Sequence, residues 1–126
     1  MEKGRQKIIS VESIDKVLKY LPIFEKQEYR GKEVSKFVET LYEEDFIISF
    51  DWGDWQSQAE QFYSKPELLD DADMIILQKL LTTHVRKARF CEGHLDCILK
   101  DGHITAILRQ LKDIRKKITD GQRKTN

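Results

Sequence analysis

The sequence predicts an all-α fold, a single-domain helical bundle of five to six helices over residues 1–126. Apolar residues recur every three or four positions along most of the chain, which is the spacing of one helix face. The composition, 40% hydrophobic and 35% charged residues, is typical of a small globular domain. One apolar run, 46–50, lacks this spacing, and a single such segment cannot form a sheet by itself. We expect an ordered core from about residue 8 to 118 and a polar, frayed tail over 119–126.

The N-terminal part contains two predicted helices and one ambiguous segment. Ser10 is a favourable N-cap for a first helix, which Pro22 is expected to end. A connection over 22–31 then leads to a second helix over 32–44, whose apolar residues have the spacing of a buried face. The run 46–50 is compatible with an extended buried segment or with a turn between helices.

The middle of the chain contains a third helix, a helical turn and a longer helix. Asp51 or Asp54 is expected to cap the third helix. Pro66 suits the start of the short helical turn that follows. Asp73 is expected to cap the longer helix, which runs to about Ala88 and turns its apolar side inward.

Two glycines divide the last third of the chain. Gly93 and Gly102 bracket a short predicted helix, and a final helix begins near His103 and ends near Ile118. The apolar residues of this final helix are three or four positions apart: Ile104, Ile107, Leu111, Ile114 and Ile118. We expect this stripe to pack into the core of its own domain. A helix-pair contact within a homodimer is the alternative.

Charge is divided between the two ends of the chain, although the formal net charge is zero. Residues 1–78 contain 10 Lys and Arg against 17 Asp and Glu, whereas residues 79–126 contain 12 against 5. We expect the acidic part to fold against the basic part. Nucleic acid is not the favoured partner, because dedicated nucleic-acid domains are usually strongly basic overall.

The sequence also predicts where the protein is found. No apolar run approaches the about 20 residues that a membrane-spanning helix needs, so no membrane partner is expected. No apolar segment follows the N-terminus as in a secretory signal. Two cysteines six positions apart are typical of reduced thiols, and we expect a cytoplasmic protein.

The candidate site lies within residues 82–103, which contain all three histidines and both cysteines. Soft metal ligands occur at Cys91, His94 and Cys97, but on one continuous helix they would point in different directions. The sequence therefore predicts no metal and no cofactor, and we expect both cysteines to be small buried residues. No catalytic motif is present, so no catalytic residue is assigned and it stays open whether the protein is an enzyme.

Arg86, Arg89 and Glu92 recur every third residue in the same span. In one interpretation, Arg89 and Glu92 form an internal ion pair at the end of a helix. In the other, the guanidinium groups of Arg86 and Arg89 grip a carboxylate or phosphate group. The candidate ligand-binding residues are His84, Arg86, Arg89, Glu92, His94 and Trp52.

Three motifs of the sequence carry a resemblance to a known family. They are Phe50-Asp51-Trp52, Arg89-Phe90-Cys91-Glu92-Gly93-His94-Leu95 and Gly102-His103-Ile104. With these motifs, roughly residues 35–115 resemble a bacterial and archaeal family catalogued only as a domain of unknown function. The resemblance implies a small prokaryotic helical protein and implies no activity, cofactor or site residue.

Three functions stay open from the sequence. The preferred one is a binding or protein-interaction module that contacts an unidentified protein or a second copy through Trp52 and the span from Arg86 to His94. The second is an enzyme or binder for an anionic small molecule, held by Arg86 and Arg89 with His84 or His94 as the acid–base residue. The third is a weak nucleic-acid binder that uses the basic C-terminal part.

Overall fold

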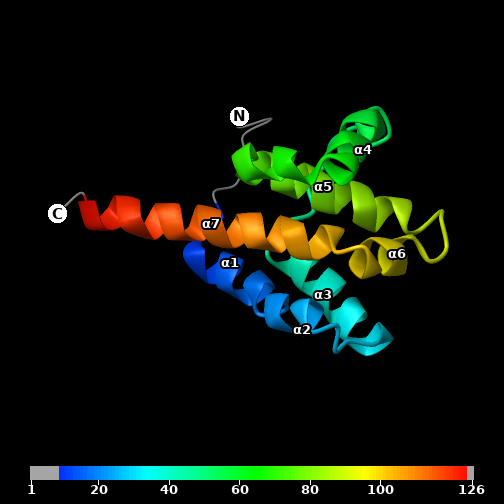
Figure 1. The fold of residues 1–126 in the computed structure, drawn as a ribbon, viewed down its shortest axis with the longest axis horizontal. Coiled ribbons are helices and arrows are strands. Elements are labelled where there is room, and N and C mark those ends of the chain that lie inside the picture. Colours follow the sequence, from blue (N-terminus) through cyan, green and yellow to red (C-terminus); the bar gives the residue numbers. More distant parts are fainter. Residues whose placement is uncertain (1–8, 125–126) are drawn as a thin grey trace.

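The chain folds as a bundle of helices around one long C-terminal helix (Figure 1). In the computed structural model, residues 9–124 are described, with side chains as far as residue 121. The described residues contain seven α-helices, one 3₁₀ helix and no strand, which confirms the predicted all-α fold. The predicted number of five to six helices is too low. No helix in this described range is long and apolar enough to span a membrane.

Two short helices begin the fold. α1 (Val11–Leu18) starts after Ser10, whose side chain accepts a hydrogen bond from a backbone N–H of the first turn, as predicted. α2 (Leu21–Glu25) follows and has Pro22 in its first turn, where a missing N–H removes no helical hydrogen bond. Pro22 therefore starts a helix, and the prediction that residues 22–31 form only a connection is wrong.

An aromatic core joins these helices to the third. α3 (Gly31–Glu43) lies close to the range predicted for the second helix. Its Phe37 is fully buried, with its ring centroid 5.0 Å from that of Phe24 and 5.4 Å from that of Tyr20. Both contacts are edge-on, which is a favourable arrangement of aromatic rings.

The apolar run 46–50 is a partly buried connection without regular structure. Phe46 is fully buried in the main core. The backbone N–H of Ile48 donates a hydrogen bond of 2.9 Å to the hydroxyl of Thr82, in α5 (Met74–Lys87). The backbone of the run is therefore satisfied in part by a helix rather than by a neighbouring strand.

The third predicted helix exists, but its predicted cap is wrong. α4 (Gln56–Ser64) begins after Trp55, which makes no side-chain cap. The Asp51 carboxylate instead accepts a hydrogen bond of 3.3 Å from the Asp54 N–H, within the turn that precedes the helix. The helical turn predicted at Pro66 is the 3₁₀ helix η1 (Pro66–Asp71).

Local signals correctly placed the next two helices. Asp73 caps α5 through a hydrogen bond of 3.1 Å from the backbone N–H of Ile76 to its carboxylate. α6 (His94–Lys100) lies between Gly93 and Gly102, as predicted. These glycines have φ angles of +81° and +84°, in the left-handed region that residues with a side chain rarely adopt.

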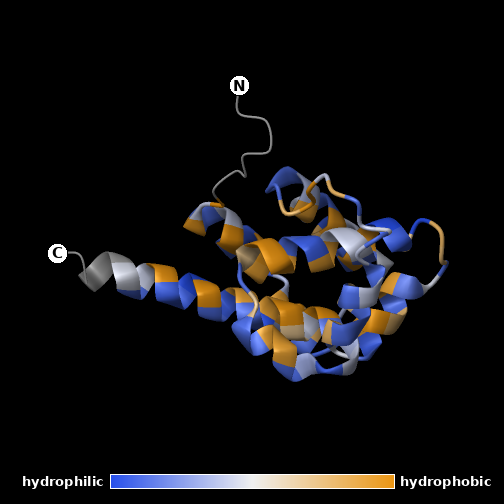
Figure 2. Ribbon diagram, turned by 90° about the horizontal axis from the view of Figure 1, so that it is seen from above, coloured by the Kyte–Doolittle hydropathy of each residue, from blue (hydrophilic) through white to orange (hydrophobic). Residues whose placement is uncertain are grey.

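The last helix, α7 (His103–Lys124), is the centre of the bundle. It packs against α1, α2, α5, α6 and η1, and apolar and polar bands alternate along it (Figure 2). Its apolar stripe is buried as predicted, completely at Ile107 and Leu111 and partly at Ile114 and Ile118. The frayed tail predicted over 119–126 is wrong as far as Lys124, because the helix continues to that residue. Residues 125–126 lie outside the described range.

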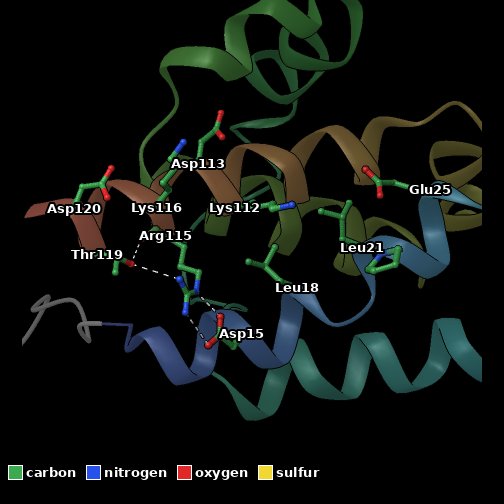
Figure 3. Close-up of a pocket in the computed structure, with 11 residues that line it drawn as sticks. Asp15, Leu18, Leu21, Glu25, Lys112, Asp113, Arg115, Lys116, Thr119 and Asp120 are labelled. Atoms are coloured by element: carbon green, nitrogen blue, oxygen red, sulfur yellow. Dashed lines mark hydrogen bonds and ion pairs between the residues drawn. The ribbon is translucent and has the colours of Figure 1, made fainter. Parts of the chain in front are cut away.

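Two ion pairs join the acidic and basic parts of the chain across the bundle. Arg115 contacts Asp15 at 2.5 Å, and Arg109 contacts Glu25 at 3.0 Å. The first pair crosses a groove of about 660 Å³ between α1, α2 and α7 (Figure 3). Charges of both signs line this groove together with apolar side chains that include Leu18. The acidic part thus folds against the basic part, as expected.

Gly93 and Gly102 are expected to be sensitive to substitution because their φ angles are left-handed. An added Cβ at Gly93 or Gly102 meets no atom of the described residues within 4 Å, so backbone strain is the main effect of a substitution. We expect Gly93→Ala and Gly102→Ala each to lower the free energy of unfolding by about 1–2 kcal/mol. The control is Gly31→Ala, where the space is also open and φ is not left-handed. Urea titrations that showed equal losses for all three variants would contradict this prediction.

Candidate functional site

The three histidines of the chain meet where three helices join. His84 lies in the last turn of α5, and His94 and His103 are the first residues of α6 and α7. The Nδ1 atom of His84 lies 3.0 Å from the Nε2 atom of His94, within hydrogen-bonding distance. The ring of His103 stands edge-on to that of His84, with centroids 4.9 Å apart. We call these three residues the histidine cluster.

Burial keeps the histidine cluster neutral. His84 is 6% exposed and His103 is 5% exposed. Burial, together with the neighbouring imidazoles, lowers the pKa of His84 to about 3. Burial and His94 lower the pKa of His103 to about 4. Burial and the nearby ammonium of Lys87 also lower the pKa of His94. All three imidazoles are therefore unprotonated near neutral pH.

Two ring nitrogens of the cluster are buried without a hydrogen-bond partner among the described residues. They are the Nε2 atoms of His84 and His103. Two neutral imidazoles share one proton and one lone pair in a hydrogen bond. The bond between His84 and His94 therefore uses only the Nδ1 atom of His84 and leaves its Nε2 atom unused. An unsatisfied buried polar atom costs about 1–3 kcal/mol, and native proteins contain few of them. A purely structural histidine would normally satisfy both ring nitrogens, so the cluster has the features of a binding site.

A cavity of about 230 Å³ lies beside the cluster, between α4, α5 and α6. We call it the histidine cavity; it is lined by Gln56, Ala59, Glu60, Tyr63, Thr83, His84, Lys87, His94, Cys97 and Ile98. Tyr63 also packs edge-on against His103, and its hydroxyl donates a hydrogen bond to Asp101 at the end of α6. This hydrogen bond, with burial, raises the pKa of Tyr63, so the phenol stays protonated.

The cysteines do not form a metal site with these histidines. Among residues 9–124, no group of three or more His, Cys, Asp or Glu side chains is arranged to hold a metal ion. Cys91 and Cys97 are both free and exposed, so the prediction that they are buried is wrong. The reason is that Cys91 lies in the turn before Gly93, while Cys97 lies on the side of α6 that borders the cavity.

A second group of residues, which includes the predicted Trp52, Arg86 and Arg89, lies at the surface. The Phe90 ring is 77% exposed and stacks on the Trp52 ring, with centroids 6.1 Å apart. The guanidinium of Arg86 lies 5.9 Å from the ring centroid of Tyr42, and that of Arg89 lies 3.5 Å from the Tyr42 hydroxyl. We call these five residues the arginine–aromatic face.

The structure thus divides the predicted candidate residues between two places. His84 and His94 lie together in the histidine cluster. In the arginine–aromatic face, Arg86 and Arg89 contact Tyr42, and Trp52 stacks on Phe90, the residue after Arg89. Glu92 is exposed in the turn that follows Phe90. Within the described residues it makes no ion pair with Arg89, whose guanidinium contacts a tyrosine instead. The ion-pair interpretation is therefore wrong.

Several residues of the histidine cluster, the histidine cavity and the arginine–aromatic face were not assigned from the sequence. His103 follows a helix-starting glycine just as His94 does, and this parallel was a usable signal. Tyr42 and Tyr63 had none, because their contacts with Arg86 and Asp101 join residues far apart in the sequence. Lys87 follows Arg86 directly, yet it lines the cavity while Arg86 contacts α3.

The fold and these two places define a small all-α protein with a neutral histidine cluster and an exposed aromatic surface. The chain belongs to a family of unknown function, DUF6508, which matches residues 28–117. The matched range includes both the histidine cluster and the arginine–aromatic face. No curated protein and no solved structure matches the chain. The prokaryotic origin that the resemblance implies stays a prediction.

Proposed function

We propose that this protein is a protein-interaction module that binds its partner through the arginine–aromatic face. The observation that carries the proposal is the 77% exposure of Phe90, the most exposed large apolar side chain among the described residues. Full burial of a phenylalanine contributes about 1.5–3 kcal/mol, and here this contribution is left for a partner to supply.

The face has the composition of an energetically important protein contact. Tryptophan, tyrosine and arginine are the residues most enriched where truncation weakens protein complexes strongly. Trp52 is half-buried and its ring stacks on the Phe90 ring, so the apolar part of the face is formed before a partner binds. A preformed contact loses little side-chain entropy on binding.

The two arginines indicate what kind of partner segment fits. Neither Arg86 nor Arg89 has a carboxylate partner among the described residues, and Tyr42 orients both guanidinium groups. A carboxylate is the natural partner for such a group, because it accepts two parallel hydrogen bonds from one guanidinium. We therefore expect a protein segment with one carboxylate beside an apolar side chain.

Nucleic acid fits this surface less well. Glu39 lies one helical turn before Tyr42, and Glu92 lies two residues after Phe90, so a phosphate backbone would meet negative charge on both sides. In the basic C-terminal part, Arg109 and Arg115 are already paired with carboxylates. These contacts favour a protein partner over the nucleic-acid alternative.

A displayed library of random peptides tests the proposal. We expect selection on the wild-type protein to enrich peptides in which Asp or Glu adjoins an apolar residue. Phe90→Ala and Arg89→Ala should each weaken the binding of these peptides by about 30-fold, the effect of losing about 2 kcal/mol. Leu68→Ala removes an apolar side chain that is 39% exposed elsewhere and is the matched control.

Two results would contradict the proposal. One is enrichment of peptides that bind the Phe90→Ala variant as tightly as the wild type. The other is a stable homodimer in sedimentation velocity that Phe90→Ala dissociates, because the face would then bind a second copy rather than a carboxylate-bearing partner.

A further inference from the structure

The histidine cavity has the properties of a built site, independently of the arginine–aromatic face. Its volume of about 230 Å³ accommodates on the order of eight water-sized groups. His84, which lines it, is 94% buried and has one ring nitrogen without a partner in the described part of the chain. His94 also lines it, and within the described residues its Nδ1 atom makes no hydrogen bond. The two imidazoles therefore have hydrogen-bonding capacity that the protein does not use.

The charges around the cavity are unequal. Lys87 supplies the ammonium group on the α5 side and makes no ion pair among the described residues. It is half-buried, so its charge is screened less than that of a fully exposed lysine. Glu60 supplies the one carboxylate of the lining, from the exposed side of α4. The lining thus has one half-buried positive charge, beside neutral imidazoles, and one exposed negative charge.

We propose that the histidine cavity binds a small organic acid or phosphate, with its anionic group held between the Lys87 ammonium and the His94 imidazole. An anion there neutralises Lys87 and favours the protonated form of His94, because opposite charge stabilises the charged form. Protonated His94 donates a hydrogen bond to His84 Nδ1 through its Nε2 atom and donates another to the anion through Nδ1. The Gln56 side chain offers a donor and an acceptor to the rest of the ligand, whereas the hydroxyls of Thr83 and Tyr63 can only accept, because they donate to the Lys79 carbonyl and to Asp101.

This site differs from the one that the sequence predicts for an anion. Arg86 and Arg89 were the expected ligands, but neither lines the histidine cavity. On a helix, positions two residues apart point about 200° apart, so Arg86 faces away from His84. Lys87 is about 300° from His84, which is nearly the same side. The cation of the cavity is therefore the lysine between the two arginines.

Imidazole NMR tests the proposal with little ambiguity. The chain has only three histidines, and all belong to the cluster, so every histidine signal reports on this site. We would titrate the wild-type protein near neutral pH with inorganic phosphate and, separately, with acetate, at constant ionic strength. We expect saturable shifts of the His94 signals and an upward movement of the His94 pKa. Saturation by only one anion identifies phosphate or carboxylate as the preferred group.

Two variants separate the site from general charge effects. Lys87→Met keeps most of the side-chain volume and should weaken binding about tenfold or more. Lys100→Met removes an exposed charge on α6 outside the cavity and should leave binding unchanged. Linear shifts without saturation, or equal affinities for the two variants, would overturn the proposal.

Thiol labelling provides a second measurement that needs no variant. Cys97 lines the cavity, whereas Cys91 is exposed in the turn and serves as an internal control. A saturating anion should slow alkylation of Cys97 by iodoacetamide and leave Cys91 unaffected. Equal labelling rates of Cys97 with and without either anion would count against the site. Phe90→Ala should not change these results, so failure of the interaction proposal leaves this one standing.

Discussion

Acidification from pH 7 to about 4.5 is expected to lower the free energy of unfolding by about 5 kcal/mol through the histidine cluster alone. The pKa values of His84 and His103 are about 3 and about 4 in the folded protein, against 6.5 for an ordinary histidine. Below about pH 6.5 the unfolded chain therefore binds more protons than the folded one. The contribution of the neutral histidines to the free energy of unfolding is complete above about pH 6.5 and is lost as the pH falls below it.

The loss is large for a protein of this size. Single domains are stable by about 5–15 kcal/mol, so the cluster alone can bring this chain close to its unfolding transition. The measurement is urea unfolding, followed by circular dichroism at several pH values between 7 and 4.5. Most carboxylates stay ionised over the upper part of this range, which separates the histidine effect from ordinary acid denaturation.

A variant of the cluster provides the control. His103→Phe removes one of the two strongly shifted groups and keeps a ring against Tyr63 and His84. The loss between pH 7 and 4.5 should fall to about half the wild-type value or less, because the His103 contribution is removed and the pKa of His84, which His103 also lowers, rises. Comparing each protein with itself removes any packing difference at position 103. If both proteins lost the same stability, the histidines would not be the cause.

Phe37→Ala is expected to lower the free energy of unfolding by about 3–5 kcal/mol and the Tm by roughly 10–20 °C. Phe37 is fully buried and contacts the rings of Phe24 and Tyr20 edge-on. Its removal leaves a cavity among α1, α2 and α3 that rigid neighbours fill only in part.

The matched comparison for this substitution is Phe90→Ala. The chemical change is the same, but the Phe90 side chain is 77% exposed. We expect a change of no more than about 0.5 kcal/mol there. Differential scanning calorimetry of the two variants measures both effects. Similar Tm values for the two would mean that Phe37 does not lie in a close-packed core.

The helix boundaries could be predicted where the signal is local. Asp73 caps α5 by bonding a backbone N–H three residues away, and Gly93 reverses the chain through its own φ angle. Pro22 was misinterpreted because proline is compatible with both the end and the start of a helix. Burial of Leu21 and Phe24 against the rest of the bundle decides between them, and no local pattern shows this burial.

The location of the candidate site in the sequence was predicted, but which of its residues lie together in space was not. The span 82–103 does contain the histidine cluster, since two glycine turns bring His84, His94 and His103 to one point. Helical geometry alone separates Arg86 from His84, so this division was available from the sequence. Trp52 was predicted as a contact residue, but its stacking on Phe90 and the contact of Tyr42 with Arg86 depend on long-range packing that the sequence does not show.

The contact between α1 and α7 also has a consequence for how the protein is made. Asp15 and its partner Arg115 are separated by 100 positions, and a ribosome adds roughly 5–20 residues per second. The apolar side of α1 therefore waits about 5–20 s before the helix that covers it has been synthesised. During this interval Ile14 and Val17, fully buried in the finished fold, are a target for chaperones that hold apolar segments of nascent chains.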